Sequence, residues 1–268
     1  MDKLIEGFER FRKVTYPTKQ RLFKKLATAQ APHTLVITCA DSRVVPEYFT
    51  SSDPGQLFVV RNVGNIVPPY AQFVGGVSAA IEYAVVVLGV KDIVVCGHSD
   101  CGAMKATLKP GSTDSMPAVT AWLRHAEVAR HVFEQNYELE DEKARLHALT
   151  EENVISQLDH LRTHPSVAAR LAAGKIGMHG WVYDIETADI RVFDAEARRF
   201  VTLQIGDDDK VMEASDTSPA KVVSGGAAAA SRAGYLRAVA YAGSALCAWP
   251  GVRPRRRHAL RQAAASSP

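Results

Sequence analysis

The sequence predicts an α/β protein in which a central, mainly parallel β-sheet is flanked by helices. Three short, nearly continuous apolar runs, Thr34–Cys39, Leu57–Arg61 and Asp92–Gly97, are typical of strands buried on both faces of a parallel sheet. The segment Gly75–Leu88 separates the second run from the third and has the pattern of a helix. The order strand, helix, strand therefore indicates a parallel connection.

The N-terminal segment predicts a helical arm. Residues 2–15 carry apolar side chains at helical spacing, and we expect this helix to end at Tyr16–Pro17, because proline interrupts the hydrogen bonds of a helix interior. A second amphipathic stretch, from Lys19 to Ala29, predicts a second helix.

The second half of the domain is predicted to be mostly helical. One amphipathic helix is expected around Trp122–Phe133 and another over Ala144–Leu161. Two later runs, Lys175–Ile185 and Ile190–Phe193, are joined by a polar turn and predict a strand pair. This pair adds an edge strand to the sheet near the C-terminal end of the domain.

Composition divides the chain into a domain over residues 1–213 and a tail over residues 214–268. The tail is rich in Ala, Gly, Ser, Pro and Arg, and from Asp216 onward it carries eight Lys or Arg residues against one Asp. We expect a disordered, low-complexity basic extension. Its cluster Arg253–Arg257 could contact acidic surfaces or nucleic acid, although charge runs are more often solvated. The domain itself is mildly acidic, so no nucleic-acid partner is expected.

The bulk composition is that of an ordinary globular protein: 47% of the 268 residues are hydrophobic and 23% are charged. The start, Met1–Lys3, leads into a charged stretch and not into the apolar segment of a secretion signal. The longest apolar run, near Ala79–Val90, contains Glu82 and is too short to span a bilayer. The four cysteines favour free thiols or metal ligands over disulfides. We therefore expect a cytoplasmic protein without a membrane partner.

Two short segments place soft metal ligands at the ends of neighbouring predicted strands. Thr38–Arg43 follows the first strand and Gly97–Gly102 follows the third. In an open parallel sheet both loops lie at the carboxyl edge, where ligands bind, so Cys39, His98 and Cys101 are expected to converge. Two thiolates and an imidazole suit zinc, and with only three such ligands the fourth position stays open, as it does in catalytic zinc sites.

The main alternative is thiol chemistry. A single cysteine at the end of a strand is usually a small apolar side chain. Cys39 could instead act as a nucleophile that is paired with His98 and assisted by Arg43. The presence of soft ligands in two equivalent loops favours the metal site.

The same residues resemble a known signature. Cys39–Arg43 and His98–Gly102, about sixty residues apart, are similar to the two-part motif of the β-class carbonic anhydrases. The likeness extends to three further stretches, Arg61–Pro69, Gly75–Tyr83 and His179–Asp184. It covers about residues 1–205 and is greatest to the bacterial form found in cyanate-degradation operons. Residues 1–213 are thus identified as a domain similar to these enzymes.

The resemblance implies a reaction and roles for five residues. The reaction is the reversible hydration of carbon dioxide to bicarbonate and a proton by a zinc-bound hydroxide. One Zn²⁺ per subunit is held by Cys39, His98 and Cys101. Asp41 accepts a hydrogen bond from the zinc-bound water, and Arg43 holds Asp41 through charge-assisted hydrogen bonds.

Asp41 has a second implied role, because in some members of the family it becomes a zinc ligand and shuts the enzyme. Those members have a Trp three residues before the first Cys, and here that residue is Val36. Arg61 and Tyr183 match the remainder of their bicarbonate site. We therefore expect Asp41 to stay paired with Arg43 and the site to stay open near neutral pH.

The resemblance also implies a substrate pocket. Its residues map onto Gln30, Phe58, Val63, Tyr83 and Gly102. Gln30 would donate a hydrogen bond to the developing bicarbonate, and Phe58, Val63 and Tyr83 would wall an apolar slot for carbon dioxide. Several of these residues come from a second subunit in the family, so a homodimer, or a homotetramer made of two dimers, is expected.

Two alternatives use the same scaffold. Hydrolysis of a carbon dioxide analogue such as carbon disulfide would need a longer and narrower channel to the metal. A zinc-stabilised interaction protein without turnover would not need the pair formed by Asp41 and Arg43. None of the histidines outside the metal site is singled out as a proton shuttle.

Overall fold

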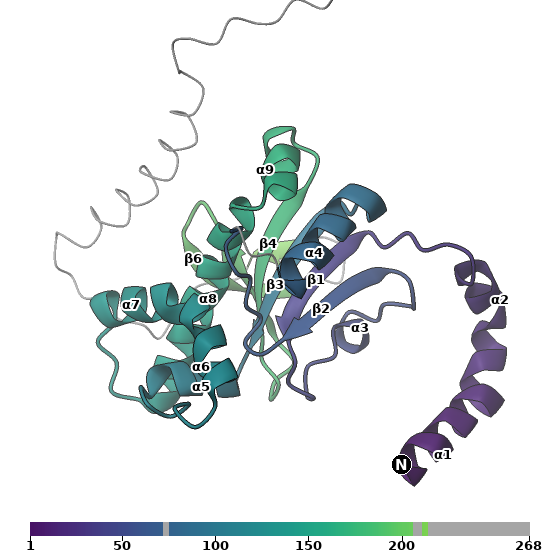
Figure 1. Ribbon diagram of the computed structural model, residues 1–268, viewed down its shortest axis with the longest axis horizontal. Helices are drawn as coiled ribbons and strands as arrows, with labels where there is room; N and C mark the ends of the chain where they lie inside the picture. Colours follow the sequence, from purple (N-terminus) through teal and green to yellow (C-terminus); the bar gives the residue numbers. More distant parts are fainter. Residues whose placement is uncertain (72–74, 206–210, 214–268) are drawn as a thin grey trace, which may run out of the picture. The chain divides into compact units, whose positions relative to one another are not determined.

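The parallel sheet is the centre of the computed structural model, which describes residues 1–71, 75–205 and 211–213. The described residues form seven strands in the order β2-β1-β3-β4-β5-β6-β7, and the first four are parallel (Figure 1). The strands are β1 Thr34–Cys39, β2 Leu57–Asn62, β3 Asp92–His98, β4 Gly177–Tyr183, β5 Ile190–Asp194, β6 Arg199–Ile205 and β7 Val211–Glu213. The α/β class and its parallel core are thereby confirmed.

The antiparallel part of the sheet is larger than expected. The strand pair β4–β5 was predicted, but β6 and β7 continue the sheet beyond it. Val201–Ile205 alternates apolar and polar residues, the pattern of a strand, but the predicted strand pair ended at Phe193 and missed it. In the structure this segment forms β6, which pairs antiparallel with β5.

Helices occupy most of the remaining described residues. They are α1 Asp2–Arg10, η1 Phe11–Thr15, α2 Tyr16–Leu26, α3 Pro46–Phe49, α4 Gly76–Glu82, η2 Tyr83–Leu88, α5 Gly102–Leu108, α6 Pro117–Leu123, η3 Arg124–Ala126, α7 Glu127–Asn136, α8 Glu142–Arg162 and α9 Pro165–Ala172. The helices expected over Gly75–Leu88 and Ala144–Leu161 are confirmed as α4–η2 and α8. The helix expected around Trp122–Phe133 is interrupted by the 3-10 turn η3.

The expected end of the first helix at Tyr16–Pro17 is wrong. The helix passes through this point by way of η1, a widened π-type turn in which the Tyr16 N–H donates to the Phe11 carbonyl. Pro17 then falls in the first turn of α2, where a helix does not need an N–H donor. The widened turn thus allows the proline to be accommodated without ending the helix.

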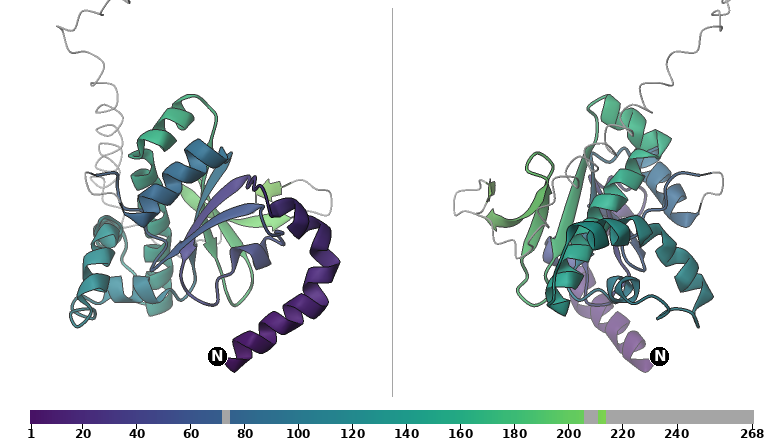
Figure 2. Two further views of the ribbon diagram at one scale, coloured as in Figure 1. Left: turned by 45° about the vertical axis from the view of Figure 1, so that its right-hand side comes forward. Right: turned by 90° about the vertical axis from the view of Figure 1, so that its left-hand side faces the viewer.

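The two faces of the sheet bury different side chains. On one face Leu35, Ile37 and Val95 pack with apolar residues of α4, η2 and α8, which include Ile81 and Val154. The other face buries a smaller cluster around Val36, Val94 and Cys96, to which α3 contributes Phe49. The right-hand view of Figure 2 shows the teal helical segments gathered on one side of the strands. The alternation follows from the two-residue period of a strand.

Two further expectations concern the C-terminal extension and membrane-spanning helices. The extension predicted over residues 214–268 lies outside the described residues. Among the helices of the described part of the chain, none has the length and hydropathy that a bilayer crossing requires.

Close packing between α8 and the sheet makes Gly180 on β4 a test of this fold. A Cβ atom there would lie 2.8 Å from Val154 Cγ1 and 3.0 Å from Leu158 Cδ1. We expect Gly180→Ala to lower the free energy of unfolding by about 1–3 kcal/mol, because overpacking forces neighbouring side chains out of place. Urea titration followed by circular dichroism measures this. Gly7→Ala in α1, where a Cβ meets nothing within 4 Å, is the control and should not be destabilised.

Candidate metal centre

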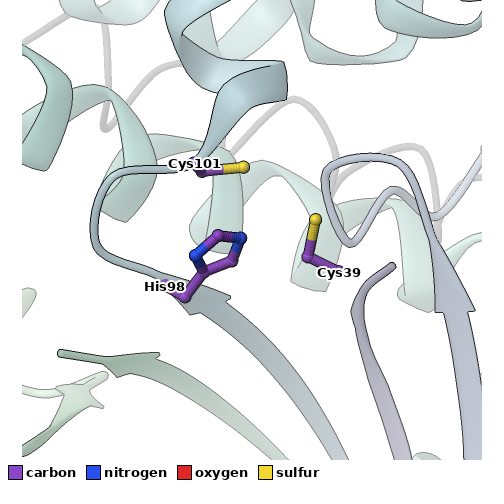
Figure 3. Close-up of side chains that lie close together, drawn as sticks. All are labelled: Cys39, His98 and Cys101. Carbon is purple, nitrogen blue, oxygen red and sulfur yellow. The ribbon is translucent and has the colours of Figure 1, made fainter. Parts of the chain in front are cut away.

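The candidate metal ligands are brought together by the pairing of β1 with β3. These strands are adjacent and parallel, and Thr38 lies opposite Cys96. Their last residues, Cys39 and His98, therefore leave the sheet at the same edge. Cys101 joins them as the N-cap residue of α5. Figure 3 shows the three side chains pointing toward one another from the ends of these elements.

The three ligand atoms have the spacing and burial of a metal site. The two Sγ atoms and an imidazole nitrogen all lie within 4.8 Å of one another. Cys39 is 5% exposed, His98 0% and Cys101 1%. Among the described residues, these three side chains form a group that could hold a metal ion. The predicted convergence is confirmed.

The orientation of His98 fits metal binding. Its Nδ1 lies 2.8 Å from the Ser99 carbonyl oxygen, an acceptor that requires Nδ1 to carry the proton. Nε2 is then the atom with the free lone pair. It is buried and has no hydrogen-bond partner among the described residues. A buried nitrogen without a partner is costly, and a metal ion would satisfy it.

The Cys39 thiol is arranged for ionisation. The hydrogen bond from Cys101, helped by His98 and by the Gly64 N–H, lowers the pKa of Cys39 to about 4. The resulting anion and burial raise the pKa of the Cys101 thiol. A divalent cation between the sulfurs removes this conflict, because it stabilises both thiolates.

A loop after β2 supports Cys39 from the side. The Gly64 N–H lies 3.4 Å from Cys39 Sγ, and the Asn153 side chain donates to the Gly64 carbonyl over 3.1 Å. The Trp122 Nε1–H donates to the adjacent carbonyl of Val63 over 2.8 Å. Sequence reasoning missed Asn153, because a polar residue in the middle of α8 has no local signature.

Asp41 and Arg43 form the close pair expected from the sequence. Arg43 Nε donates to Asp41 Oδ1 over 3.0 Å and Nη2 donates to Oδ2 over 2.8 Å. The backbone N–H of Arg43 also donates to Oδ1 over 3.0 Å. Hydrogen bonding from the Arg43 side chain holds the pKa of Asp41 well below its usual range. Asp41 Oδ2 lies 4.0 Å from His98 Nε2, at the mouth of the ligand cluster.

Arg61 and Tyr183 match the bicarbonate site of the resembled family, and Val36 occupies the position of its Trp. Arg61 donates to the carbonyls of Cys39 over 3.2 Å and of Asp41 over 2.6 Å, so it fixes the backbone of the loop that carries both. Val36 is buried on the sheet face in one apolar cluster with Tyr183. The expectation that Asp41 stays off the metal remains a prediction.

Two of the substrate-pocket candidates border the ligands. Gly102 directly follows Cys101 and begins α5. Val63 precedes Gly64, whose N–H contacts Cys39 Sγ, and Val63 is 42% exposed. These positions suit an apolar wall beside the open side of the cluster.

The other candidates lie elsewhere within one chain. Phe58 and Tyr83 lie together, with ring centroids 6.0 Å apart. Phe58 pairs with Leu35 at the start of β1, however, whereas Cys39 is at its end. Gln30 is exposed in the loop that leads into β1. The chain by itself does not bring Phe58 and Tyr83 to the metal ligands.

A cavity of about 720 Å³ lies beside Arg43. Arg43, Asp100 and His147 are among its lining residues. Burial raises the pKa of nearby Glu151 to about 7 and lowers the pKa of His147 to about 4. Asp100 also pairs with Arg43, a contact that the sequence motif did not reveal.

Buried soft ligands beside an ionised carboxylate, at the carboxyl edge of a parallel sheet, define an α/β metalloenzyme. The carbonic anhydrase family model matches residues 34–190. A carbonic anhydrase of Pseudomonas aeruginosa is 57% identical over 76% of this chain and 92% of its own length. The chain therefore belongs to the carbonic anhydrase family, in its β class, whose reaction is the reversible hydration of carbon dioxide to bicarbonate and a proton.

Solved structures agree with this assignment. The β-carbonic anhydrase CcaA has a TM-score of 0.74 and 42% identity, and the match covers 76% of this chain and 92% of that one. A tetrameric β-carbonic anhydrase of Sordaria macrospora has a TM-score of 0.64 and 29% identity, covering 72% of this chain and 96% of that one. The alternatives of thiol catalysis and of a non-catalytic zinc protein are not supported.

The pH dependence of stability tests the burial of His147, which lines the same cavity as Arg43. Unfolded histidine titrates near pH 6.5, whereas burial lowers the pKa of His147 to about 4. The unfolded state therefore binds the additional proton first, and this group's contribution to stability is lost as the pH falls from about 6.5 to about 4. As the pH falls through about 5, the free energy of unfolding of the wild type should decrease relative to that of His147→Gln by about 1.4 kcal/mol per pH unit.

Urea titrations from about pH 4 to pH 8 measure this difference. His131→Gln on α7 is the control, because that histidine is exposed, and it should keep the pH dependence of the wild type. Parallel curves for His147→Gln and the wild type would contradict the burial of His147.

Proposed function

We propose that Cys39, His98 and Cys101 hold one Zn²⁺ per subunit and that carbon dioxide is hydrated beside them. The observation that carries this proposal is the buried cluster of three soft ligand atoms with His98 Nε2 left without a partner. When bound, zinc supplies the Lewis acidity that makes a water molecule nucleophilic near neutral pH. Three ligands leave one tetrahedral position for that water.

Asp41 is proposed to orient the reacting water. Its pKa is held low by Arg43, so its carboxylate stays ionised at working pH and acts as a hydrogen-bond acceptor. For the same reason Asp41 cannot store the proton that the reaction releases. Arg43 uses two side-chain donors to fix the plane of the carboxylate, which reduces the entropy lost when the water is aligned.

The substrate pocket is proposed to form between two subunits. Phe58 lies four residues before Asn62, the partner of Cys39 in the sheet, which is about 13 Å along a strand. Phe58 and Tyr83 therefore cannot wall the metal site of their own chain. Supplied by a second copy, together with Gln30, they would complete the slot begun by Val63 and Gly102.

The N-terminal arm supports a homodimer. Its apolar side chains are exposed, with Leu4 at 73%, Phe8 at 58% and Val14 at 61%. No residue of α1, η1 or α2 is buried by the described part of the chain. An amphipathic helix with an uncovered apolar stripe is stabilised by packing on another surface. We propose that this surface belongs to a second copy, with dimers able to pair into a tetramer.

Two finer assignments are also proposals. The cytoplasm is the compartment favoured, because thiolate ligands persist best where thiols are kept reduced. The bacterial type found in cyanate-degradation operons is favoured by the similarity of Arg61–Pro69, Gly75–Tyr83 and His179–Asp184. The genes beside this one would test the second assignment directly.

The role of Asp41 is tested by Asp41→Ala. We expect kcat for carbon dioxide hydration to fall about 10- to 100-fold, because groups that orient metal-bound ligands typically contribute that much. Stopped-flow hydration, with zinc quantified in each sample, makes the measurement. The zinc content should stay at that of the wild type, whereas Cys101→Ala should lose the metal. Asp114→Ala is the control, and a kcat of Asp41→Ala equal to that of the wild type would refute the proposal.

The proposed dimer is tested by placing a charge on the apolar stripe of the arm. Phe8→Lys should shift the molecular mass in sedimentation equilibrium toward the 29.1 kDa of one chain. Its kcat should fall as well, because Phe58 and Tyr83 would no longer reach the partner's metal site. Glu6→Lys, on the polar side of the same helix, should keep the mass of the wild type. An unchanged mass for Phe8→Lys would contradict the role of the arm.

A further inference from the structure

Asp100 lies in the metal loop, between His98 and Cys101, and contacts the outer side of Arg43. Asp100 Oδ2 accepts a hydrogen bond from Arg43 Nη1 over 3.1 Å. The Asp100 carbonyl oxygen accepts another from Arg43 Nη2 over 3.3 Å. Asp100 Oδ1 pairs with Lys105 of α5. One residue therefore connects the metal loop, the guanidinium and the helix that follows Cys101.

The Arg43 guanidinium is held on both of its edges. The edge formed by Nε and Nη2 faces the Asp41 carboxylate, and Nη1 together with Nη2 faces Asp100. The Arg43 side chain is 45% exposed and lines the cavity of about 720 Å³, so water competes for its donors. The two bonds to Asp41 fix the guanidinium and the carboxylate relative to each other, and the contacts with Asp100 also tie the guanidinium to the metal loop. The second anchor restricts the guanidinium to the plane in which it meets both oxygens of Asp41.

The backbone at Asp100 serves the same geometry. Its φ is +58°, in the left-handed region that Gly, Asn and Asp tolerate best. This conformation turns the loop so that both the side chain and the carbonyl of Asp100 face Arg43. Lys105 holds the remaining carboxylate oxygen and so limits rotation of the Asp100 side chain.

We propose that Asp100 is a positioning residue for carbon dioxide hydration, which fixes the Arg43 guanidinium and through it the Asp41 carboxylate. The proposal rests on the role proposed above for Asp41 and Arg43. Asp100 does not touch the reacting atoms, so its loss should lower turnover without changing how carbon dioxide binds.

A pair of substitutions separates the side chain of Asp100 from its backbone. Gly and Asn both accept a positive φ, but only Asn keeps an oxygen that can accept from Arg43 Nη1. We expect Asp100→Gly to lower kcat about five-fold with an unchanged KM for carbon dioxide, as the loss of one charge-assisted hydrogen bond at a partly exposed site implies. Asp100→Asn should stay within about two-fold of the wild type. Equal kcat values for Asp100→Gly and the wild type would overturn the proposal.

A double-mutant cycle shows whether Asp100 acts through Arg43. In an Arg43→Ala background, Asp100→Gly should cause no further loss of kcat, because the group that it positions is gone. An equal loss in both backgrounds would mean that Asp100 acts by another route, and it would also overturn the proposal. Lys143→Met is the control, because its ion pair with Glu186 lines the same cavity and touches neither Arg43 nor Asp100.

A structural measurement completes the test without relying on turnover. In crystals of the full-length metal-free protein, Asp100→Gly should show the Arg43 guanidinium turned away from Asp41 or spread over several orientations. Asp100→Asn should keep the wild-type orientation, and a single wild-type orientation in Asp100→Gly would overturn the inference.

If Arg43→Ala and Asp41→Ala both hydrate carbon dioxide like the wild type, the proposed roles of that pair fail. If only Asp100→Gly does so, the role of Asp100 alone fails.

Discussion

The parallel pairing of β1 with β3 is the constraint on which the functional site depends. It places the last residues of both strands, Cys39 and His98, at one edge of the sheet, where Cys101 can join them from the start of α5. A side-chain hydrogen bond from Thr38 to the Cys96 carbonyl, 2.9 Å long, reinforces this register. A slip by one residue would turn every side chain of β1 to the opposite face and remove a ligand from the cluster.

Helix α8 gives the metal edge its rigidity. Buried Asn153 and Gln157 and half-buried His160 of this helix hydrogen-bond to the loop after β2. Asn153 bonds to the Gly64 carbonyl, Gln157 to the Val67 N–H over 2.8 Å and His160 to the Val67 carbonyl over 2.7 Å. Buried polar groups are tolerated because these bonds satisfy them. The loop in turn presents the Gly64 N–H to Cys39. Polar residues that would weaken an apolar core thus hold the surroundings of a thiolate in place.

The electrostatics of the site combine burial with exposure. The candidate ligands are almost fully buried, which would strengthen their interaction with a cation. Arg43 remains partly exposed and has contacts on both edges of its guanidinium. A single chain also leaves the apolar residues Phe58 and Tyr83 far from the metal edge. The proposed dimer would link oligomerisation to catalysis, because Phe58 and Tyr83 of one subunit would complete the substrate slot of the other.

The sequence by itself determined the α/β class, the first three strands, α8 and the convergence of Cys39, His98 and Cys101 as candidate ligands, because buried parallel strands and soft side chains at strand ends leave local signals. It could not determine that the N-terminal helix continues past Pro17. The π-type turn that permits this is defined by a backbone hydrogen bond, from the Tyr16 N–H to the Phe11 carbonyl, and not by a pattern of residues. The contacts of Asn153 with Gly64 and of Asp100 with Arg43 join residues distant in sequence, and only tertiary structure brings them together. The separation of Phe58 from Cys39 was likewise decided by strand register, which no local pattern encodes.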